Sequence, residues 1–289
     1  MPISIAVYKE RKWATGMKPI RLFYFREKNR KQNFGDALSP LLLERVLERP
    51  VQWAHPRDCQ IAAIGSILES TVRKSWQRPL RFRFQPIEIW GSGTIRPGGQ
   101  LSTRNVNINA VRGRMTLNRV LETNVPTEIA LGDPALLCPH FFPTSNKTTY
   151  EWALIPHLSD QHLPKVRALL GNTPNCRIID LESDVTEVIY TASQAEFIAS
   201  SSLHGIVLAT ALGKPFVHIN LSDKVAGGNW KFDDFTSAFH AIRMSHQDTS
   251  EIASLRQLSS EAQLIPLADV ARLQDGLIKA ANVLSSSLL

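Results

Sequence analysis

The sequence predicts an α/β protein made of two Rossmann-like domains that face one another across a cleft. Short apolar runs alternate with helical patterns through most of the 289 residues. A polar, proline-containing break at residues 140–149 divides this alternation into two series. Strands and helices that alternate in this way form parallel sheets covered by helices on both faces. The chain is also long enough to bury two hydrophobic cores.

The first series of apolar runs predicts an N-terminal domain over residues 1–145. Its strand candidates are residues 20–25, 60–65, 87–91, 107–111 and 129–132. Ser39 and Pro40, followed by LLLERVLE, predict a helix with Ser39 as its cap and Pro40 at its first position. A second helix is predicted at residues 115–122.

The second series predicts a C-terminal domain over residues 146–289. Its strand candidates are residues 152–156, 177–181, 196–199 and 215–219. Helices are predicted at residues 161–170, 185–192 and 204–212. A terminal amphipathic helix at residues 268–284 is expected to pack back on the N-terminal domain.

The charge and hydropathy of the chain limit its partners. A formal net charge of +7 favours an anionic partner, and ordinary solubility charge is the alternative. The densest basic segment, residues 26–31, is short and contains no aromatic residue, so nucleic acid is not an expected partner. No apolar run reaches about 18 residues and no signal peptide is recognisable, so we expect a cytoplasmic protein.

The three cysteines, Cys59, Cys138 and Cys176, stand far apart in the sequence. An odd count without a spacing pattern argues against a disulfide framework and against a zinc site. We therefore expect each cysteine to be a small buried hydrophobic residue, and we expect no bound metal.

The segments that follow the strands form the candidate site, because ligands of open parallel sheets bind beyond the carboxyl ends of the strands. The first such segment is Asn33-Phe34-Gly35-Asp36. Gly35 permits close backbone approach, and Asp36 can act as a base or accept a hydrogen bond from a sugar hydroxyl. A turn with a capping acid is the alternative interpretation.

Glycines follow the third apolar run of the first series. Gly91, Ser92 and Gly93 predict either a loop that cradles an anion or a plain tight turn. No GxGxxG or Walker pattern is present, so the dinucleotide and triphosphate interpretations are weak. Asp133, which precedes Pro134, is predicted to be a turn or helix-capping residue.

Arg112 and Arg114 stand where a predicted strand meets a predicted helix. The helix dipole disfavours cations at that place. Two guanidinium groups there indicate an anionic ligand, with arginine clamping a carboxylate or a phosphate. Surface ion pairing is the alternative.

In the second series, Ser202 and His204 follow an apolar run and open a helix. We expect His204 to lie in the first turn and to face the cleft, although a packed or solvated histidine is the alternative. Lys224 follows the next apolar run. Neighbouring strand ends meet at one cleft, so His204 and Lys224 can share a ligand unless Lys224 belongs to a charged surface loop.

The ordered segments NFGD, WGSGT, VRGRMT, LGDPALLCP, LIPH, SSLHG and SDKV together resemble the polysaccharide pyruvyl transferase family. The resemblance extends from about residue 22 to about residue 235. Each segment alone is a weak signal, and it is their order and spacing that are specific. The sequence is most similar to the shorter bacterial members, which modify exopolysaccharides such as succinoglycan.

The resemblance implies a glycosyltransferase-B-like fold with the active site in the interdomain cleft. It implies phosphoenolpyruvate as the donor and a sugar diol of an exopolysaccharide, or of its lipid-linked precursor, as the acceptor. The products are then a cyclic pyruvate ketal and phosphate. The family's arginine, its LH-motif histidine and its following lysine match Arg112, His204 and Lys224. Ser202 replaces an arginine found in many relatives, and Arg114 or Arg96 could supply that charge instead.

A different role is expected for each of these residues. His204 would be the general acid, and Arg112 and Lys224 would hold the donor, with Arg114 and Ser202 beside them. Asp36 would orient or deprotonate the acceptor, in a loop region that includes Asn33, Gly35, Gly91, Ser92 and Gly93. The N-terminal domain is thus expected to be the acceptor side of the cleft and the C-terminal domain the donor side. No cofactor is expected. We do expect weak contact with the anionic face of a membrane. The alternatives are a nucleotide-sugar-dependent glycosyltransferase of similar fold and a non-catalytic carbohydrate-binding protein.

Overall fold

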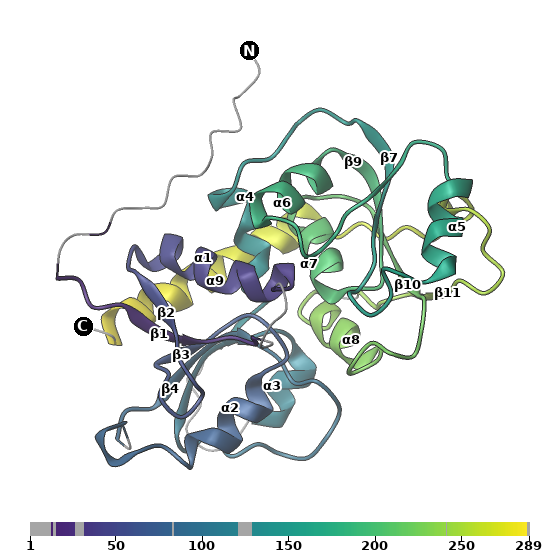
Figure 1. Ribbon diagram of the computed structural model, residues 1–289. Helices are drawn as coiled ribbons and strands as arrows, with labels where there is room; N and C mark the ends of the chain where they lie inside the picture. The colour runs from purple at the N-terminus through teal and green to yellow at the C-terminus, as the bar shows by residue number, and fades with distance from the viewer. Residues whose placement is uncertain are drawn as a thin grey trace.

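Two parallel β-sheets dominate the computed structural model, which describes residues 13, 16–26, 32–82, 84–120, 129–240 and 242–287. Among these residues, one sheet has the strand order β2-β1-β3-β4-β5-β6 and the other β11-β10-β9-β7-β8. Every pairing between these strands is parallel. In Figure 1 the first sheet lies at lower left and the second at upper right. The prediction of an α/β fold with two Rossmann-like sheets is confirmed.

The first sheet is built from residues 20–131. Its strands are β1 (Ile20–Phe23), β2 (Val51–Trp53), β3 (Ile61–Ala62), β4 (Ile87–Ser92), β5 (Val106–Val111) and β6 (Ala130–Leu131). Its helices are α1 (Phe34–Leu47), α2 (Leu68–Ser75), the short 3-10 helix η1 (Leu80–Phe82) and α3 (Arg114–Val120). The predicted strands are all present. The sequence missed β2, because it is short and exposes Gln52 and Trp53, and it also missed α2.

The start of α1 corrects one prediction. The helix begins at Phe34, and Pro40 lies inside it rather than at its first position. Ser39 is consequently a buried helical residue and no cap. A proline in a helix interior is costly, but Phe34, Leu38 and Leu42 are fully buried along one face of this helix. Their burial outweighs the local stop signal at Ser39 and Pro40.

The second sheet is built from residues 150–248. Its strands are β7 (Tyr150–Ile155), β8 (Cys176–Ile178), β9 (Ala195–Ser200), β10 (Phe216–Asn220) and β11 (His246–Asp248). Its helices are α5 (Pro164–Asn172), α6 (Val185–Ser193), α7 (Leu203–Ala211), α8 (Trp230–Thr236) and the 3-10 helix η3 (Leu255–Glu261). Each predicted element of this series is present. The sequence missed β11, a polar edge strand, and α8, which is only seven residues long.

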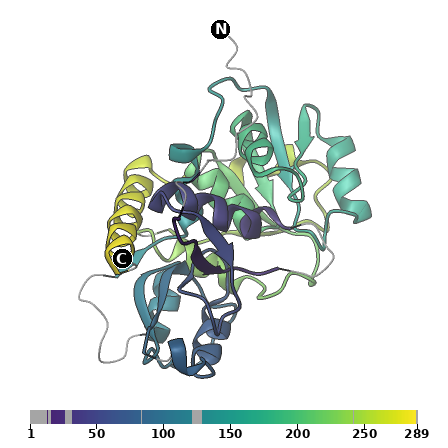
Figure 2. The same cartoon turned by 60° about the vertical axis from the view of Figure 1, so that its left-hand side comes forward.

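Two short helices and the last helix connect the two sheets. The 3-10 helix η2 (Pro134–Leu137) leads into α4 (Cys138–Phe141), so the polar break predicted at residues 140–149 starts inside a helix. Helix α9 (Leu267–Ser287) packs against β4, β5, β6 and α1. Figure 2 shows α9 in yellow beside α1. The indole of Trp90 donates a hydrogen bond to the carbonyl of Leu277, 3.0 Å away. The chain therefore returns to the first sheet after completing the second.

One hydrophobic core extends through both sheets. It includes Leu22 and Trp90 from the first sheet, Ile155 and Ile198 from the second, and Leu277 from α9. Burial of this shared apolar surface holds the two sheets in a fixed relation. The domain boundary between residues 145 and 146 stays a prediction.

The structure also shows the state of the cysteines, the groups that could bind a metal, and the character of the helices. Cys59 and Cys138 are buried, Cys176 is half-buried, and all three are free thiols. Within the described ranges, His, Cys, Asp and Glu form no group of three that could hold a metal ion. None of the helices in those ranges combines the length and apolarity needed to cross a bilayer.

Candidate functional site

The carboxyl ends of strands from both sheets meet at His204. His204 lies in the first turn of α7, directly after β9. Gly35 lies in the first turn of α1, in the segment that follows β1. A Cβ atom added at Gly35 would stand 2.1 Å from the His204 ring atom Cε1. The backbone of α1 therefore packs directly on the imidazole, and only glycine leaves room for this contact.

The imidazole of His204 is buried and incompletely hydrogen-bonded. The residue is 9% exposed, and its Nε2 has no hydrogen-bond partner among the described residues. Burial, together with the positive charges of Lys231 and Arg112, lowers the pKa of His204 to about 3. A buried polar atom without a partner costs about 1–3 kcal/mol, so native proteins rarely keep one without a functional reason.

Lys231 contributes a buried cation within electrostatic range of this imidazole. It lies on α8 and is 8% exposed. Its Nζ stands 5.3 Å from the centre of the Phe232 ring. Burial is the main cause that lowers the pKa of Lys231 to about 8, with Arg112 adding to it and Asp160 opposing it. The described residues form no ion pair with this amine. No local pattern pointed to Lys231, because it belongs to a helix that was not predicted.

Asp160 ties together the segments that follow three strands of the second sheet. Its buried carboxylate accepts hydrogen bonds from Ser201 Oγ at 2.7 Å and from Ser222 Oγ at 2.5 Å. Ser201 Oγ in turn accepts one from the backbone N–H of His157 at 2.9 Å. The pKa of His157 is lowered, mainly by burial and then by Lys231. The hydroxyl groups thus orient the loops around Lys231, His204 and His157.

The segment before α1 contributes two more unpaired polar atoms. Asn33 Oδ1 and Gln32 Nε2 are buried and lack hydrogen-bond partners in the described chain. Asp36, half-buried, lies in the first turn of α1 next to Gly35. The predicted acceptor-side residues Asn33, Gly35 and Asp36 are therefore brought to the same place as His204. Their roles stay predictions.

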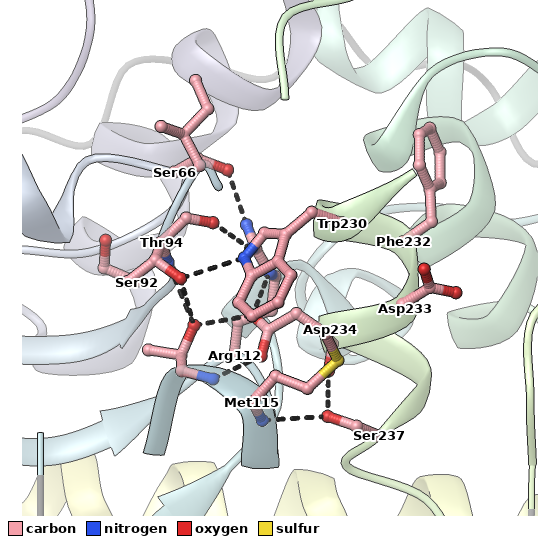
Figure 3. A network of polar contacts seen from close by, with 12 residues as sticks. Ser66, Ser92, Thr94, Arg112, Met115, Trp230, Phe232, Asp233, Asp234 and Ser237 are labelled. Atoms are coloured by element: carbon pink, nitrogen blue, oxygen red, sulfur yellow. Dashed lines mark hydrogen bonds and ion pairs between the residues drawn. The ribbon is translucent and has the colours of Figure 1, made fainter. Parts of the chain in front are cut away.

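Arg112 is engaged in a closed network of protein contacts (Figure 3). It is fully buried, and its Nε donates to Asp234 Oδ2 at 2.8 Å. Its Nη1 donates to Ser66 Oγ, and its Nη2 to the Thr94 carbonyl, both at 2.6 Å. Asp234 comes from α8 in the second half of the chain. The anion beside Arg112 is thus a carboxylate of the protein itself, and a donor-binding role for Arg112 stays a prediction.

The same carboxylate caps helix α3. Asp234 Oδ1 accepts a hydrogen bond from the backbone N–H of Thr116 at 2.7 Å, and Oδ2 accepts one from Thr116 Oγ1 at 2.8 Å. A negative charge at a helix N-terminus is stabilising. A Cβ atom at Gly113 would stand 1.6 Å from the Asp234 carbonyl oxygen, so glycine is needed for this close approach. The network therefore joins the two halves of the chain.

The glycine-rich segment after Trp90 supports this network. Gly91 and Ser92 close β4, and Ser92 Oγ donates to the Gly65 carbonyl at 2.9 Å. A Cβ atom at Gly93 would stand 2.3 Å from Arg112 Cζ. The backbone N–H groups of Gly93 and Thr94 donate to Gly65 O and Thr116 Oγ1 at 3.1 and 3.0 Å. Those two donors already have protein acceptors, which leaves the segment poorly suited to cradle an anion.

The remaining predicted residues are dispersed. Lys224 is exposed and lines a cavity of about 860 Å³ together with Ser201. Arg114 is exposed and lines a different cavity, of about 1060 Å³, between α3 and α9. Arg96 is also exposed. Ser202 is buried, and its N–H donates to Ser200 Oγ at 2.9 Å. Ser202 stands two residues before His204 in the sequence. Arg114 lines a different cavity from Lys224.

Asp133 has the structural role that its position before Pro134 predicted. It is fully buried and caps η2, accepting a hydrogen bond from the Ala135 N–H at 3.0 Å. Burial raises its pKa to about 6, against the effect of that hydrogen bond. The capping interpretation is confirmed.

Comparison with known proteins supports the family resemblance. The family model for polysaccharide pyruvyl transferases matches residues 100–223. This is narrower than the range of about 22 to 235 expected from the sequence motifs. It includes Arg112, Ser202 and His204, while Lys224 lies just beyond it. The predicted resemblance to this family is confirmed.

Two curated relatives are similar over part of the chain. The succinoglycan biosynthesis protein ExoV of Rhizobium meliloti is 25% identical over 127 residues, which is 43% of this chain and 38% of ExoV. An uncharacterized protein of Acanthamoeba polyphaga mimivirus is 29% identical over 137 residues, 45% of this chain and 47% of that protein. The matches thus span less than half of each curated relative.

Two solved structures are similar at low sequence identity. MnaA of S. aureus, solved with UDP, has a TM-score of 0.49 and 12% identity over 91% of each chain. A UDP-N-acetylglucosamine 2-epimerase has a TM-score of 0.42 and 11% identity, covering 91% of this chain and 79% of its own. Neither likeness bears on the ligand of this chain.

Proposed function

We propose that this chain, which resembles the polysaccharide pyruvyl transferase family, transfers the enolpyruvyl unit of phosphoenolpyruvate to a sugar. The acceptor would be a diol on an exopolysaccharide or its lipid-linked precursor. The products would be a pyruvate ketal and phosphate. The family match over residues 100–223 and the similarity to ExoV support pyruvyl transfer in general.

The unpaired, buried imidazole of His204 beside the buried amine of Lys231 is the observation that carries this proposal. Both groups are at least nine-tenths buried, and the described residues supply neither with a carboxylate ion-pair partner. A trianionic donor would neutralise Lys231 and give His204 Nε2 a hydrogen-bond partner. Small ligands with concentrated negative charge fit such a site, since buried cations require a counter-charge.

The same electrostatics would couple proton donation to donor binding. The low pKa of His204 in this structure means that its imidazole is neutral near pH 7. An anion bound at Lys231 favours the charged form of a neighbouring histidine and therefore raises its pKa. His204 would become an acid only when the donor is present, which prevents proton transfer in its absence.

The proposed chemistry begins with a proton moving from His204 to the methylene carbon of the enol phosphate. This creates an oxocarbenium-like carbon, which one sugar hydroxyl attacks with formation of a C–O bond. The C–O bond to phosphate then breaks, and the second hydroxyl closes the ketal. Of the two hydroxyl protons released, one restores His204 and the other leaves with phosphate. Asp36, beside Gly35, is proposed to take the first hydroxyl proton. Lys231 and Lys224 would stabilise the departing phosphate, and the proposal uses no metal or cofactor.

A phosphate-release assay with the purified chain tests the proposal. Phosphoenolpyruvate is incubated with a panel of free and lipid-linked glycosides, and parallel reactions omit the glycoside. The expected result is glycoside-dependent release of phosphate together with a new methyl signal of the ketal in the NMR spectrum of the product. A matched panel of nucleotide sugars serves as the comparison. Release of nucleotide from these, with no release of phosphate from phosphoenolpyruvate, would replace this proposal by the glycosyltransferase alternative.

A further inference from the structure

A hydrogen-bonded chain of three side chains lies next to the cavity of about 860 Å³ in the second half of the chain. Asp233 Oδ1 on α8 lies 2.9 Å from His246 Nε2 on β11. His246 Nδ1 lies 2.8 Å from His218 Nδ1 on the neighbouring strand β10. The ring of His218 also packs on Phe232, with 3.8 Å between the ring centres. The proposed chemistry above leaves these residues without a role.

The carboxylate at one end determines the direction of the hydrogen bonds. A carboxylate only accepts, so His246 donates to Asp233 through Nε2–H. While His246 is neutral, its Nδ1 carries the lone pair and accepts from His218 Nδ1–H. His218 Nε2 is left with a lone pair and without a hydrogen-bond partner among the described residues. With a neutral His246, the chain therefore holds His218 in one tautomer, with Nε2 as an acceptor.

The cavity that His218 lines is polar. Its wall contains the amides of Asn220 and Asn229, the hydroxyl of Ser222 and the carboxylate of Asp248. Lys224, which is proposed above to stabilise the departing phosphate, also lines it, so donor and acceptor would share this cavity. Phe232 packs on His218, and the two residues are only 1% and 2% exposed. Amides, hydroxyls and carboxylates at the wall are suited to a ligand that carries many hydroxyl groups.

We infer that this cavity binds the sugar acceptor, and that His218 Nε2 takes the proton of one attacking hydroxyl while His246 and Asp233 position its ring. The inference rests on the proposed function. It assigns the second of the two hydroxyl protons, since Asp36 is proposed for the first. His218 is then a catalytic residue, and His246 and Asp233 are positioning residues.

The base need not be strong for this step. When the hydroxyl oxygen bonds to the oxocarbenium-like carbon, it becomes a positively charged oxonium and its proton is strongly acidic. The C–O bond forms, the O–H bond breaks, and the proton moves to His218 Nε2. Burial, and to a smaller extent His246 and Lys231, lower the pKa of His218 to about 3. His218 is accordingly unprotonated near neutral pH and available as an acceptor.

Lys231 connects this cavity to the donor cluster. Its charge lowers the pKa of His218 and that of His204, so the amine lies within electrostatic range of both imidazoles. Ser201 lines the cavity and also bonds to Asp160, the carboxylate that acts on Lys231. A donor held at Lys231 would thus be next to an acceptor held at His218.

Two substitutions test the inference in the phosphate-release assay. His218→Gln should lower kcat by about 100- to 10,000-fold, while the KM for phosphoenolpyruvate stays within about threefold. Asp233→Asn should lower kcat at least about tenfold, because an amide can donate to His246 and reverse both tautomers. The exposed residue His140 provides the matched control, and His140→Gln should behave as wild type. Turnover of His218→Gln within about twofold of wild type would overturn the base role.

Nitrogen-15 NMR of the histidine side chains tests the same inference without turnover. The full-length chain should show His218 with a protonated Nδ1 and a bare Nε2, and Asp233→Asn should shift it toward the other tautomer. Methyl β-galactoside and methyl β-glucoside serve as probes, and at least one should perturb the His218 Nε2 signal. A protonated Nε2 in the wild type, or no perturbation by either glycoside, contradicts the inference. If the wild type releases no phosphate with any acceptor, the proposed function fails, while the NMR result still decides on the cavity.

Discussion

The Arg112 network and the His204 cluster each contain a buried cation and lie where the two sheets meet, yet they differ in one respect. Arg112 has a carboxylate 2.8 Å away and donates to two further oxygen atoms. His204 has an unpaired Nε2 and lies beside an amine for which the described residues supply no ion-pair partner. Burial of a positive charge therefore does not by itself identify a ligand site. What distinguishes the two regions is whether the protein satisfies its own polar groups.

This difference predicts opposite consequences for substitution. In the Arg112 network the protein supplies both charges, so removal of either leaves the other buried and unpaired. In the His204 cluster the described residues form no ion pair with Lys231, although Asp160 acts on it electrostatically. Removal of a group there should therefore change the stability of the fold little and the turnover strongly.

The largest effect is expected on turnover from His204→Gln. If His204 is the general acid, kcat should fall by about 100- to 10,000-fold. The free energy of unfolding should change by less than about 1 kcal/mol, because glutamine keeps hydrogen bonding at the start of α7 and the histidine has an unsatisfied atom to lose. Steady-state kinetics and urea unfolding measure the two quantities.

The pH profile gives a second check on His204. The bound donor raises the pKa of His204. Wild-type kcat should therefore fall as the pH rises through the pKa that His204 has in the complex with the donor. That limb should be missing in His204→Gln. If the variant keeps near-normal turnover and the same limb, the proton comes from Lys231, Lys224, Asp36 or water.

The next largest effect is expected on stability, from Asp234→Asn and Arg112→Met. Each substitution leaves one buried charge unpaired, and we expect a loss of about 3–5 kcal/mol in the free energy of unfolding. Glu151→Gln is the matched control, because it breaks the solvent-exposed ion pair with Arg256 and should cost less than about 1 kcal/mol. Urea unfolding compares the three variants.

The same variants decide whether Arg112 also binds the donor. If Arg112→Met folds with wild-type stability and raises only the KM for phosphoenolpyruvate, Arg112 is a donor ligand as its sequence position predicted. The network with Asp234 would then contribute little to folding.

Lys231→Met should stabilise the fold and weaken donor binding. The pKa of Lys231 is lowered from 10.5 to about 8, so the folded chain binds this proton less tightly than the unfolded chain. Stability therefore rises with pH between about 8 and 10.5, and the penalty is fully present below pH 8. Replacing the amine should raise the free energy of unfolding at pH 7 by up to about 3 kcal/mol.

Lys224→Ala is the natural comparison for Lys231→Met. Loss of the buried amine should raise the KM for phosphoenolpyruvate by about 10- to 100-fold, corresponding to one charge-assisted interaction. The exposed Lys224 should have a smaller effect on KM and none on stability, and Lys224→Arg should restore its function only in part. A larger increase in KM from Lys224→Ala than from Lys231→Met would indicate that the donor binds at the loop after β10. Unfolding curves at pH 7 and pH 9.5 and initial rates measure both.

The smallest effect concerns the surface outside both regions. With a net charge of +7, the chain is expected to attach weakly to anionic vesicles at low salt, with about 1 kcal/mol from each basic residue near the surface. Flotation with phosphatidylserine-containing vesicles and with neutral vesicles measures this attachment. Equal flotation with both kinds would exclude an electrostatic contact.

The sequence predicted most of the fold because the relevant signals are local. Apolar runs such as residues 107–111 and 196–199 reveal buried parallel strands without knowledge of their neighbours. The prediction was wrong at Pro40, where the local start signal yielded to the burial of Phe34 and Leu38. It missed β11 and α8, which are short and polar or irregular in pattern, so the Asp233–His246–His218 chain could not be foreseen.

By itself the sequence determined which segments end at the functional edge, because parallel strands send their carboxyl ends to one side of a sheet. It placed Gly35 and His204 there, and the structure brings them into contact. Only the tertiary structure decided which charges are paired. Arg112 and Asp234 are 122 residues apart, and the buried Lys231 lies in a helix without a sequence signal. Charge pairing depends on which side chains packing brings within a few ångströms of each other, and no local pattern in a sequence encodes that distance.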